Sequence, residues 1–237
     1  AGSLYLENSE IDNIDLRLEY YFGFNQFFTA GIFSKEILNP IEETVNESGD
    51  LIITSYQNVP LAEINGFEIE YEQVFEAIMD SPNDLLVKFN YTETESEVIV
   101  NPGDIYINSI GTVVDAQNLL ANGRDTRLQG QSDTIANFQI GLDNLQNQTQ
   151  ATLIVNYVSD RVRARGIDVL PDIIEEPPLL VDFAFSKIYS YPEFELKLSL
   201  ELRNLLDEEY YASMRNIAIY DQYDLGTSAS LGFKISF

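Results

Sequence analysis

The sequence predicts an all-β protein of about nine antiparallel strands, and side-chain alternation is the main reason. Apolar and polar residues alternate with a period of two in one segment after another, most clearly at residues 194–203 and 228–237. Because successive side chains point to opposite faces of a strand, each such segment has one apolar face and one polar face. No segment has a clear helical period.

The strands can be placed one by one, and their centres lie near residues 16, 31, 70, 90, 140, 155, 182, 198 and 232. In all but the second, alternation identifies an apolar face. In chain order, that face is formed by Ile14, Leu16, Leu18 and Tyr20; by Phe67, Ile69 and Tyr71; by Leu85, Val87, Phe89 and Tyr91; by Phe138, Ile140 and Leu142; by Leu153, Val155 and Tyr157; by Leu179, Val181, Phe183 and Phe185; by Phe194, Leu196, Leu198 and Leu200; and by Leu231, Phe233 and Ile235.

The connections between these strands alternate in length. Short ones lie near 22–25, 76–84, 145–149 and 188–193, and long ones near 37–63, 96–135, 161–177 and 207–225. Alternate connections of an up-and-down meander fall at opposite ends of the sheet. The sequence therefore predicts tight turns at one end and long loops at the other, which is typical of outer-membrane barrels.

Composition excludes several classes of function. The chain has 237 residues, 39 acidic and 13 basic side chains, and a formal net charge of −26, which disfavours binding to nucleic acid. Because His and Cys are absent, zinc sites, thiol nucleophiles, haem ligation by His and iron–sulfur clusters are excluded.

Carboxylate chemistry is the remaining possibility for an enzyme. Neither the spacing of a glycosidase pair nor that of a calcium loop occurs among Glu42 and Glu43, Glu93 to Glu97, or Glu175 and Glu176, which are expected to be solvated loop residues. A Gly-x-Ser-x-Gly motif and a phosphate loop are also absent. We therefore expect no enzymatic activity, no catalytic residue, no metal and no cofactor.

Alternation by itself favours a soluble β-sandwich, so a soluble acidic β-sheet domain for binding or adhesion is the alternative. Three features favour a transmembrane barrel. Several segments alternate for about the 9–11 residues that a tilted spanning strand needs, the turn lengths alternate, and the last strand ends on the aromatic Phe237.

Several motifs resemble those of TonB-dependent outer-membrane receptors. The stretch LRNLLDEEYY from Leu202 to Tyr211 resembles the NLfDkeYy signature after the second-to-last barrel strand, and the segment from Ser230 to Phe237 resembles the closing strand. Further matches follow the family's order. They are ENSE at 7–10 with Asp15 and Leu16, FSK at 33–35 with NPI at 39–41, NGFE at 65–68, LQGQS at 128–132 with Asn137, and Asp182; Asp133 replaces a usual Pro.

The resemblance implies that residues 1–237 are the C-terminal portion of a receptor barrel, without the plug and the N-terminal strands. About 22 strands close the family's barrel, and a nine-stranded meander has first and last strands that run the same way. No apolar run reaches the roughly 18 residues of a membrane helix, and from the pattern of the first residues we expect no signal peptide within this sequence. We therefore expect a fragment or one part of a larger assembly.

The function implied by the resemblance is import of a scarce ligand, such as a ferric siderophore, cobalamin or a glycan, across the bacterial outer membrane. The implied partners are the remaining strands and plug, TonB acting through the plug, and the outer-membrane assembly machinery, which would read Phe237 as its signal. The long connections would be extracellular. Charged residues such as Glu195, Lys197, Glu201, Arg203 and Lys234 would line the lumen.

The long connections also hold the candidate ligand-binding residues. Arg161, Arg163 and Arg165 form a dense group that alternation would place on one side of a strand, and Arg124, Arg127 and Arg215 are the other loop cations. Clustered arginines are suited to carboxylate, phosphate or a ferric chelate. The alternative is pairing with nearby acids such as Asp160 and Asp168.

Tyrosines near the C-terminus are the second candidate group. Tyr210, Tyr211, Tyr220 and Tyr223 lie in or beside the last long connection. They are suited to stack on a sugar or a catecholate, and packing within a hairpin is the alternative. The predicted ligand-binding residues are therefore Arg161, Arg163, Arg165, Arg215, Tyr220 and Tyr223.

Overall fold

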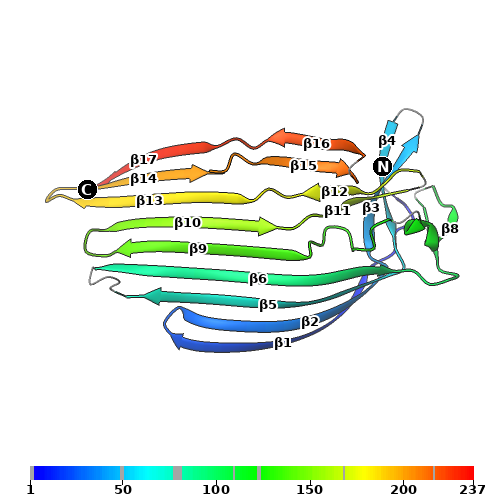
Figure 1. Ribbon diagram of the computed structural model, residues 1–237, viewed down its shortest axis with the longest axis horizontal. Coiled ribbons are helices and arrows are strands. Elements are labelled where there is room, and N and C mark those ends of the chain that lie inside the picture. The colour runs from blue at the N-terminus through cyan, green and yellow to red at the C-terminus, as the bar shows by residue number, and fades with distance from the viewer. Residues whose placement is uncertain are drawn as a thin grey trace.

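A computed structural model describes residues 3–48, 51–76, 82–108, 110–121, 124–167, 169–215 and 217–237. Its main element is a nine-stranded sheet in which strand order follows chain order and every neighbouring pair is antiparallel (Figure 1). The strands are β1 (Glu10–Gly23), β2 (Gln26–Leu38), β5 (Leu61–Phe75), β6 (Asn83–Ile99), β9 (Thr134–Asn144), β10 (Thr149–Val158), β13 (Leu180–Ser190), β14 (Glu195–Arg203) and β17 (Ser228–Ser236). The expected all-β class and antiparallel meander are confirmed, and the nine expected strands form this sheet, but the described residues also contain further strands that the sequence analysis did not expect.

The short connections lie at one end of this sheet, which we call the turn end, and the long ones lie at the other, the loop end (Figure 1). Most of the expected 76–84 connection lies outside the described residues. No helix in the described part of the chain is both long and apolar enough to cross a membrane. The helical segment among the described residues is the short 3₁₀ turn η2 (Ala116–Leu119).

The expected alternation produces a sheet with two different faces. Cross-strand rows such as Phe89, Phe138 and Val155 stay apolar from strand to strand, and we call the face that they form the outward face. Rows such as Lys88, Gln139 and Ile154 form the opposite, more polar concave face. Arg17 bridges Glu68 and Glu70 at 3.2 and 3.4 Å on this face, so part of its charge is paired across strands.

The expected long loops are only partly loops, because three of them form β-hairpins that join into a second sheet. Its order is β16-β15-β12-β11-β3-β4. The strands are β3 (Ile41–Ser48), β4 (Leu51–Asn58), β11 (Arg161–Gly166), β12 (Ile173–Glu176), β15 (Glu209–Met214) and β16 (Ala218–Asp224). The central pairing of β11 with β3 is parallel, and it brings together segments that follow distant strands of the main sheet.

The fourth long connection, 96–135, contains the small hairpin of β7 (Ile105–Ile107) and β8 (Val113–Asp115) and the turn η2. Its side chains contribute to one buried cluster, which is formed by Val59, Ala62, Val98, Tyr106, Ala116 and Leu119. A second cluster lies within the six-stranded sheet, around Val45, Ala164, Ile173 and Ala212. Both hydrophobic clusters therefore lie at the loop end.

The LRNLLDEEYY motif lies where the last hairpin passes from one sheet to the other. Asn204 has a left-handed backbone (φ 52°) immediately after β14. Its side-chain amide donates to the carbonyls of Glu208 and Gly226 at 3.0 and 3.2 Å, and its Oδ1 accepts from the Glu208 amide at 3.1 Å. One Asn side chain thus holds the bends of both strands of the hairpin.

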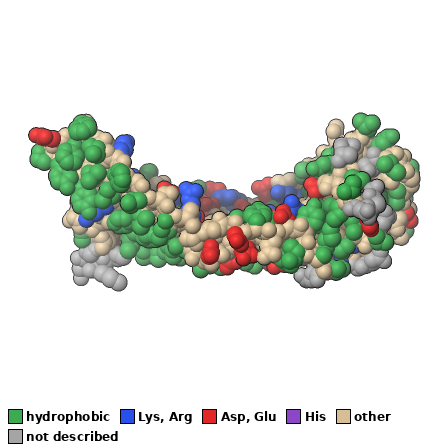
Figure 2. All heavy atoms as spheres, turned by 90° about the horizontal axis from the view of Figure 1, so that it is seen from above, with side chains coloured by type: hydrophobic (Ala, Val, Ile, Leu, Met, Phe, Trp, Pro, Cys, Tyr) green, Lys and Arg blue, Asp and Glu red, His purple; other side chains and the backbone are tan. Residues whose placement is uncertain are grey.

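Both edges of the main sheet are open. β1 pairs only with β2, and β17 pairs only with β14, so the described strands form no closed barrel. Figure 2 shows the molecule hollowed along its length between two raised ends, with acidic and basic side chains in the hollow and hydrophobic side chains over much of the flank. Large apolar residues are uncovered at both edges, for example Ile14 at 78% and Phe233 at 73% exposure.

Candidate functional site

The loop end is built around one buried ion pair. Arg165 at the end of β11 and Glu42 near the start of β3 are both fully buried, and the Arg165 Nη2 donates to Glu42 Oε1 at 2.9 Å. The same guanidinium donates to the carbonyls of Asp125 and Arg127 at 2.7 and 2.9 Å. Arg165 therefore joins β3, β11 and the 124–133 segment, and it is a structural residue rather than the ligand-binding residue that the sequence suggested.

Two further polar side chains complete this junction. The backbone N–H of Gln129 donates to the Glu42 carboxylate at 3.1 Å. The Gln129 side chain accepts from the backbone N–H of Glu43 and donates to the backbone carbonyl of Arg163. Asp172 is also fully buried and accepts from the amides of Asp125 and Gly166 at 2.9 and 3.0 Å. The expectation that Glu42 lies in a solvated loop was wrong, because Arg165 and Gln129 compensate its charge inside the protein.

Arg163 of β11 contacts a group of mainly aromatic side chains from β15 and β16, at one edge of the second sheet. We call this group the Arg163 cluster; it contains Arg163, Tyr210, Tyr220, Asp221 and Tyr223. The Arg163 Nη1 donates to the Tyr210 hydroxyl at 3.0 Å and to Asp221 at 3.3 Å, and its guanidinium carbon is 5.3 Å from the centre of the Tyr220 ring. Tyr210 and Tyr223 stack at 4.7 Å. Three of the predicted ligand-binding residues, Arg163, Tyr220 and Tyr223, thus lie together, and each contacts another side chain of the protein.

Arg161 lies beside this cluster and pairs with Glu175 of β12 at 2.8 Å. The three arginines have different surroundings because the strand is irregular. The register of β11 against β12 shifts between Val162 and Ala164, which is where Arg163 lies. A bulge of this kind interrupts the alternation of side chains, so the expectation that all three arginines act on one side was wrong. Of the acids expected as partners, Asp160 pairs with Arg127, and Asp168 lies outside the described residues.

Arg215, the remaining arginine of the predicted ligand-binding set, lines a pocket of about 470 Å³ with Asp125, Arg127, Asp160 and Glu176. Arg127 is the best-connected cation of this pocket, since it pairs with Asp125 at 2.8 Å, Asp160 at 2.9 Å and Asp133 at 3.4 Å. These residues are polar and surface-accessible, but the cations are matched by nearby carboxylates.

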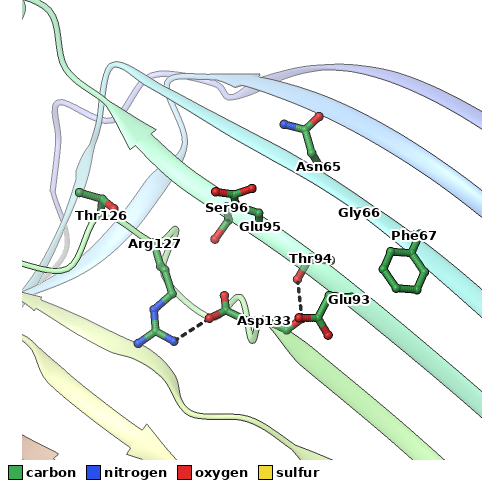
Figure 3. Close-up of a pocket in the computed structure, with 10 residues that line it drawn as sticks. All are labelled: Asn65, Gly66, Phe67, Glu93, Thr94, Glu95, Ser96, Thr126, Arg127 and Asp133. Carbon is green, nitrogen blue, oxygen red and sulfur yellow. Dashed lines mark hydrogen bonds and ion pairs between the residues drawn. The ribbon is translucent and has the colours of Figure 1, made fainter.

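Arg127 and Asp133 also face a second pocket, of about 630 Å³, on the outward side of β5 and β6 (Figure 3). Figure 3 shows the two side chains pointing toward each other on one side, with Asn65, Phe67 and Glu93 along the strands. Glu93 accepts from Thr134 at 2.9 Å. The lining is therefore mostly polar, with the carboxylates of Glu93, Glu95 and Asp133 and the cation Arg127 beside the Phe67 ring.

Two of these carboxyl groups have shifted pKa values. Burial would raise the pKa of Asp125, but hydrogen bonds from Arg127 and its charge outweigh burial and lower it. Burial raises the pKa of Asp133, in spite of the nearby Arg127. Burial likewise raises the pKa of Tyr210, and Glu175 adds to that shift.

No group of three or more Asp, Glu, His or Cys residues in the described part of the chain is arranged to hold a metal ion.

Phe237 lies at the turn end, far from the loop-end residues, and its side chain is fully exposed. Its ring centre is 6.5 Å from that of Phe194, which stacks on Tyr191 at 4.7 Å. The structure therefore places the expected assembly signal beside an aromatic group at the open β17 edge.

Sequence reasoning missed the residues that organise the loop end, above all Glu42, Gln129 and Asp172. The sequence contains one signal for this junction, the LQGQS motif at 128–132. Gln129 is the residue of that motif that contacts Glu42 and Arg163. Nothing near Asp172 in the sequence indicates that its carboxylate is buried.

The fold and this site define an all-β protein with an open, two-faced sheet and a second sheet at its loop end. No family model matches the chain. The curated GTPase Der of Thermosipho africanus (strain TCF52B) is 26% identical to it over 177 residues, which are 72% of this chain and 39% of that protein. The chain thus spans about two fifths of the length of the curated relative. It contains no Gly-x-x-x-x-Gly-Lys-Ser/Thr phosphate loop.

Proposed function

We propose that this chain is the C-terminal part of the barrel of a TonB-dependent transporter in a bacterial outer membrane. In this role it binds a scarce ligand, such as a ferric siderophore, cobalamin or a glycan, and imports it with energy from TonB. The outward face contacts lipid, the concave face lines the lumen, and the loop end receives the ligand. The mechanism is binding and gated transport without bond chemistry.

The observation that carries the proposal is the uncovered apolar face. One cross-strand row, formed by Leu85, Leu142, Ala151, Phe185, Leu200 and Leu231, crosses six neighbouring strands without a polar side chain. Both hydrophobic clusters lie at the loop end, so no second layer covers this face among the described residues. An exposed apolar surface of this extent favours aggregation in water, whereas lipid accommodates it.

Strand stagger also supports a barrel. One row joins Tyr21 of β1 to Asp182 of β13 in six strand-to-strand steps. Tyr21 lies two residues before the end of β1, whereas Asp182 lies eight residues before the end of β13, so the row shifts by six residues at the turn end. At the loop end, Tyr21 lies eleven residues after the start of β1, whereas Asp182 lies two residues after the start of β13, so the row shifts by nine residues there.

These shifts correspond to a definite tilt. With about 3.3 Å per residue and about 4.8 Å between strands, a stagger of roughly 1–1.5 residues per strand tilts the strands by roughly 35–45°. Transmembrane barrels need tilts in this range. The sheet is thus already sheared as a barrel wall would be.

The height of the apolar band is consistent with the same proposal. On β6, Leu85, Val87, Phe89 and Tyr91 lie between the polar Asn83 and Glu93. Ten residues extend about 33 Å along a strand, which at the tilt given above spans about 23–27 Å of height. Transmembrane barrels have an apolar band about 25 Å tall.

The open edges indicate what completes the barrel. β1 and β17 run in the same direction, because they are the first and the ninth strand of a sheet in which every neighbouring pair is antiparallel. Antiparallel closure therefore requires an odd number of additional strands, and a lipid-facing edge left open would leave backbone groups unpaired. We assign these strands and the plug to the partners of this chain, together with TonB and the assembly machinery.

The chain contains no Cys, so single-cysteine labelling can test the membrane wall. Leu153→Cys and Thr152→Cys are neighbours on β10 that lie on the outward and concave faces. In the full chain reconstituted in lipid, a fluorophore at position 153 should be quenched by brominated lipid, and one at position 152 by aqueous iodide. Equal iodide quenching at both positions would contradict the lipid-facing wall.

Transport requires a separate test in cells. A strain that produces the complete transporter should take up iron-loaded siderophore, cobalamin or an oligosaccharide, and a strain without it should not. Uptake should disappear when TonB is deleted. Uptake that persists without TonB would contradict the transport mechanism while leaving the barrel wall intact.

A further inference from the structure

Among the described residues of the nine-stranded sheet, the outward face carries one cation, Lys187. Lys187 of β13 lies in a cross-strand row with Asn83, Asn144 and Thr149, which are the polar residues next to the turn end on neighbouring strands. The adjacent row toward the loop end is the apolar row that contains Leu85 and Phe185. On β13 and its neighbours β14 and β17, the outward face continues toward the turn end with Tyr189, Leu196 and Ile235, so Lys187 lies just inside the turn-end border of the apolar band.

The Lys187 side chain extends toward the turn end. Its ammonium nitrogen lies 5.1 Å from the centre of the Tyr189 ring, two residues nearer the turn. Tyr191 and Phe194 stack on each other just beyond it. Lysine that extends away from an apolar surface, next to aromatic rings, is typical of the border between hydrocarbon and headgroups.

The charge of Lys187 is not neutralised by the protein. Among the described residues, Lys187 forms no ion pair with a carboxylate, although the chain has three times as many acidic as basic residues. At the opposite, loop-end border of the outward face, the row of Asp12, Glu36, Glu63 and Glu97 is entirely acidic. The two borders of the band thus carry opposite charge, which gives them different affinities for anions.

We propose that Lys187 binds the phosphate of an anionic membrane glycerophospholipid whose acyl chains lie along Phe185, Leu198 and Leu200. Leu198 is directly opposite Lys187 on β14, and Leu200 is directly opposite Phe185, so an apolar track begins beside the ammonium group. The inference rests on the proposed membrane wall, and it adds a lipid site on the leaflet at the turn end.

A reporter beside Lys187 tests the site. In the full chain reconstituted in phosphatidylcholine, Leu198→Cys carries a fluorophore, and a small fraction of the lipid is replaced by brominated phosphatidylglycerol or by brominated phosphatidylcholine. We expect phosphatidylglycerol to be enriched about fivefold beside the reporter, the effect of one basic side chain near an anionic lipid. Lys187→Gln should remove this enrichment.

Lys234→Gln is the matched control, because Lys234 lies on the concave face of β17, opposite Lys197. It removes the same charge and should leave the enrichment unchanged. Equal quenching by the two brominated lipids before any substitution, or enrichment that survives Lys187→Gln, would overturn the lipid site. Absence of quenching by either lipid would overturn the membrane wall as well, so the two failures are distinguishable.

Discussion

Arg165 and Glu42 lie 123 residues apart in the sequence and form an ion pair in which both side chains are fully buried. Each charged group also has hydrogen bonds to the backbone. Arg165 donates to two backbone carbonyls, and Glu42 accepts from the backbone N–H of Gln129. The pair joins two hairpins and the 124–133 segment, so the arrangement of the loop end depends on it.

Removing one partner of this pair should therefore be costly. Arg165→Met leaves Glu42 buried without a counter-charge, and we expect a loss of about 3–5 kcal/mol in the stability of the loop end. The double variant Glu42→Gln with Arg165→Met should recover part of it. Hydrogen exchange of the β3–β4 and β11–β12 hairpins measures both; a single variant as protected as the wild type would show that the pair is dispensable.

Close approach of the chain makes Gly166 irreplaceable. A Cβ there would lie 2.2 Å from the Leu170 carbonyl oxygen and 2.4 Å from that of Pro171. Gly166→Ala should thus displace the 166–172 turn and the Asp172 carboxylate, with a cost of about 1–3 kcal/mol. Gly141→Ala is the control, because a Cβ at that position meets only ordinary contacts at 3.5 Å or more. Equal thermal stability of the two variants would contradict this account.

Arg127 should control the titration of Asp125. Because the folded-state pKa of Asp125 is lowered, its stabilising contribution is complete above its unfolded pKa of about 3.9 and is lost as pH falls through the folded value. Arg127→Gln should raise the pKa of Asp125, which carboxyl NMR would detect, and move acid-induced opening of the loop end to higher pH. Arg203→Gln, which removes an exposed cation that pairs with Glu201 on β14, should leave Asp125 unchanged. An unaltered Asp125 titration in Arg127→Gln would refute the assignment.

Asn204 should matter through its side chain more than through its backbone. Asn204→Gly tolerates the left-handed conformation but removes the bonds to Glu208 and Gly226, and we expect a loss of about 1–3 kcal/mol. Asn204→Ala should cost more, because it adds backbone strain. Limited proteolysis at 204–208 and 225–227 would report the change. A fully stable Asn204→Gly variant would leave the motif without this structural role.

The second sheet shows where sequence reasoning is limited. The Arg163 cluster contains three of the six predicted ligand-binding residues, yet Arg165 lies inside the protein and Arg161 pairs with Glu175. Alternation failed there because a register shift in β11 changes which way side chains point. The parallel pairing of β11 with β3 has no local signal either, since its two strands are separated by more than a hundred residues.

The sequence by itself determined the nine strands of the main sheet, their antiparallel order and the separation of apolar from polar side chains. These features depend on neighbours two residues apart, and a period of two is visible without any tertiary contact. Only the tertiary structure decided that the long connections form a second sheet and that Glu42 and Arg165 are buried together. Burial of a charge depends on a partner that compensates its desolvation, and that partner is distant in the chain.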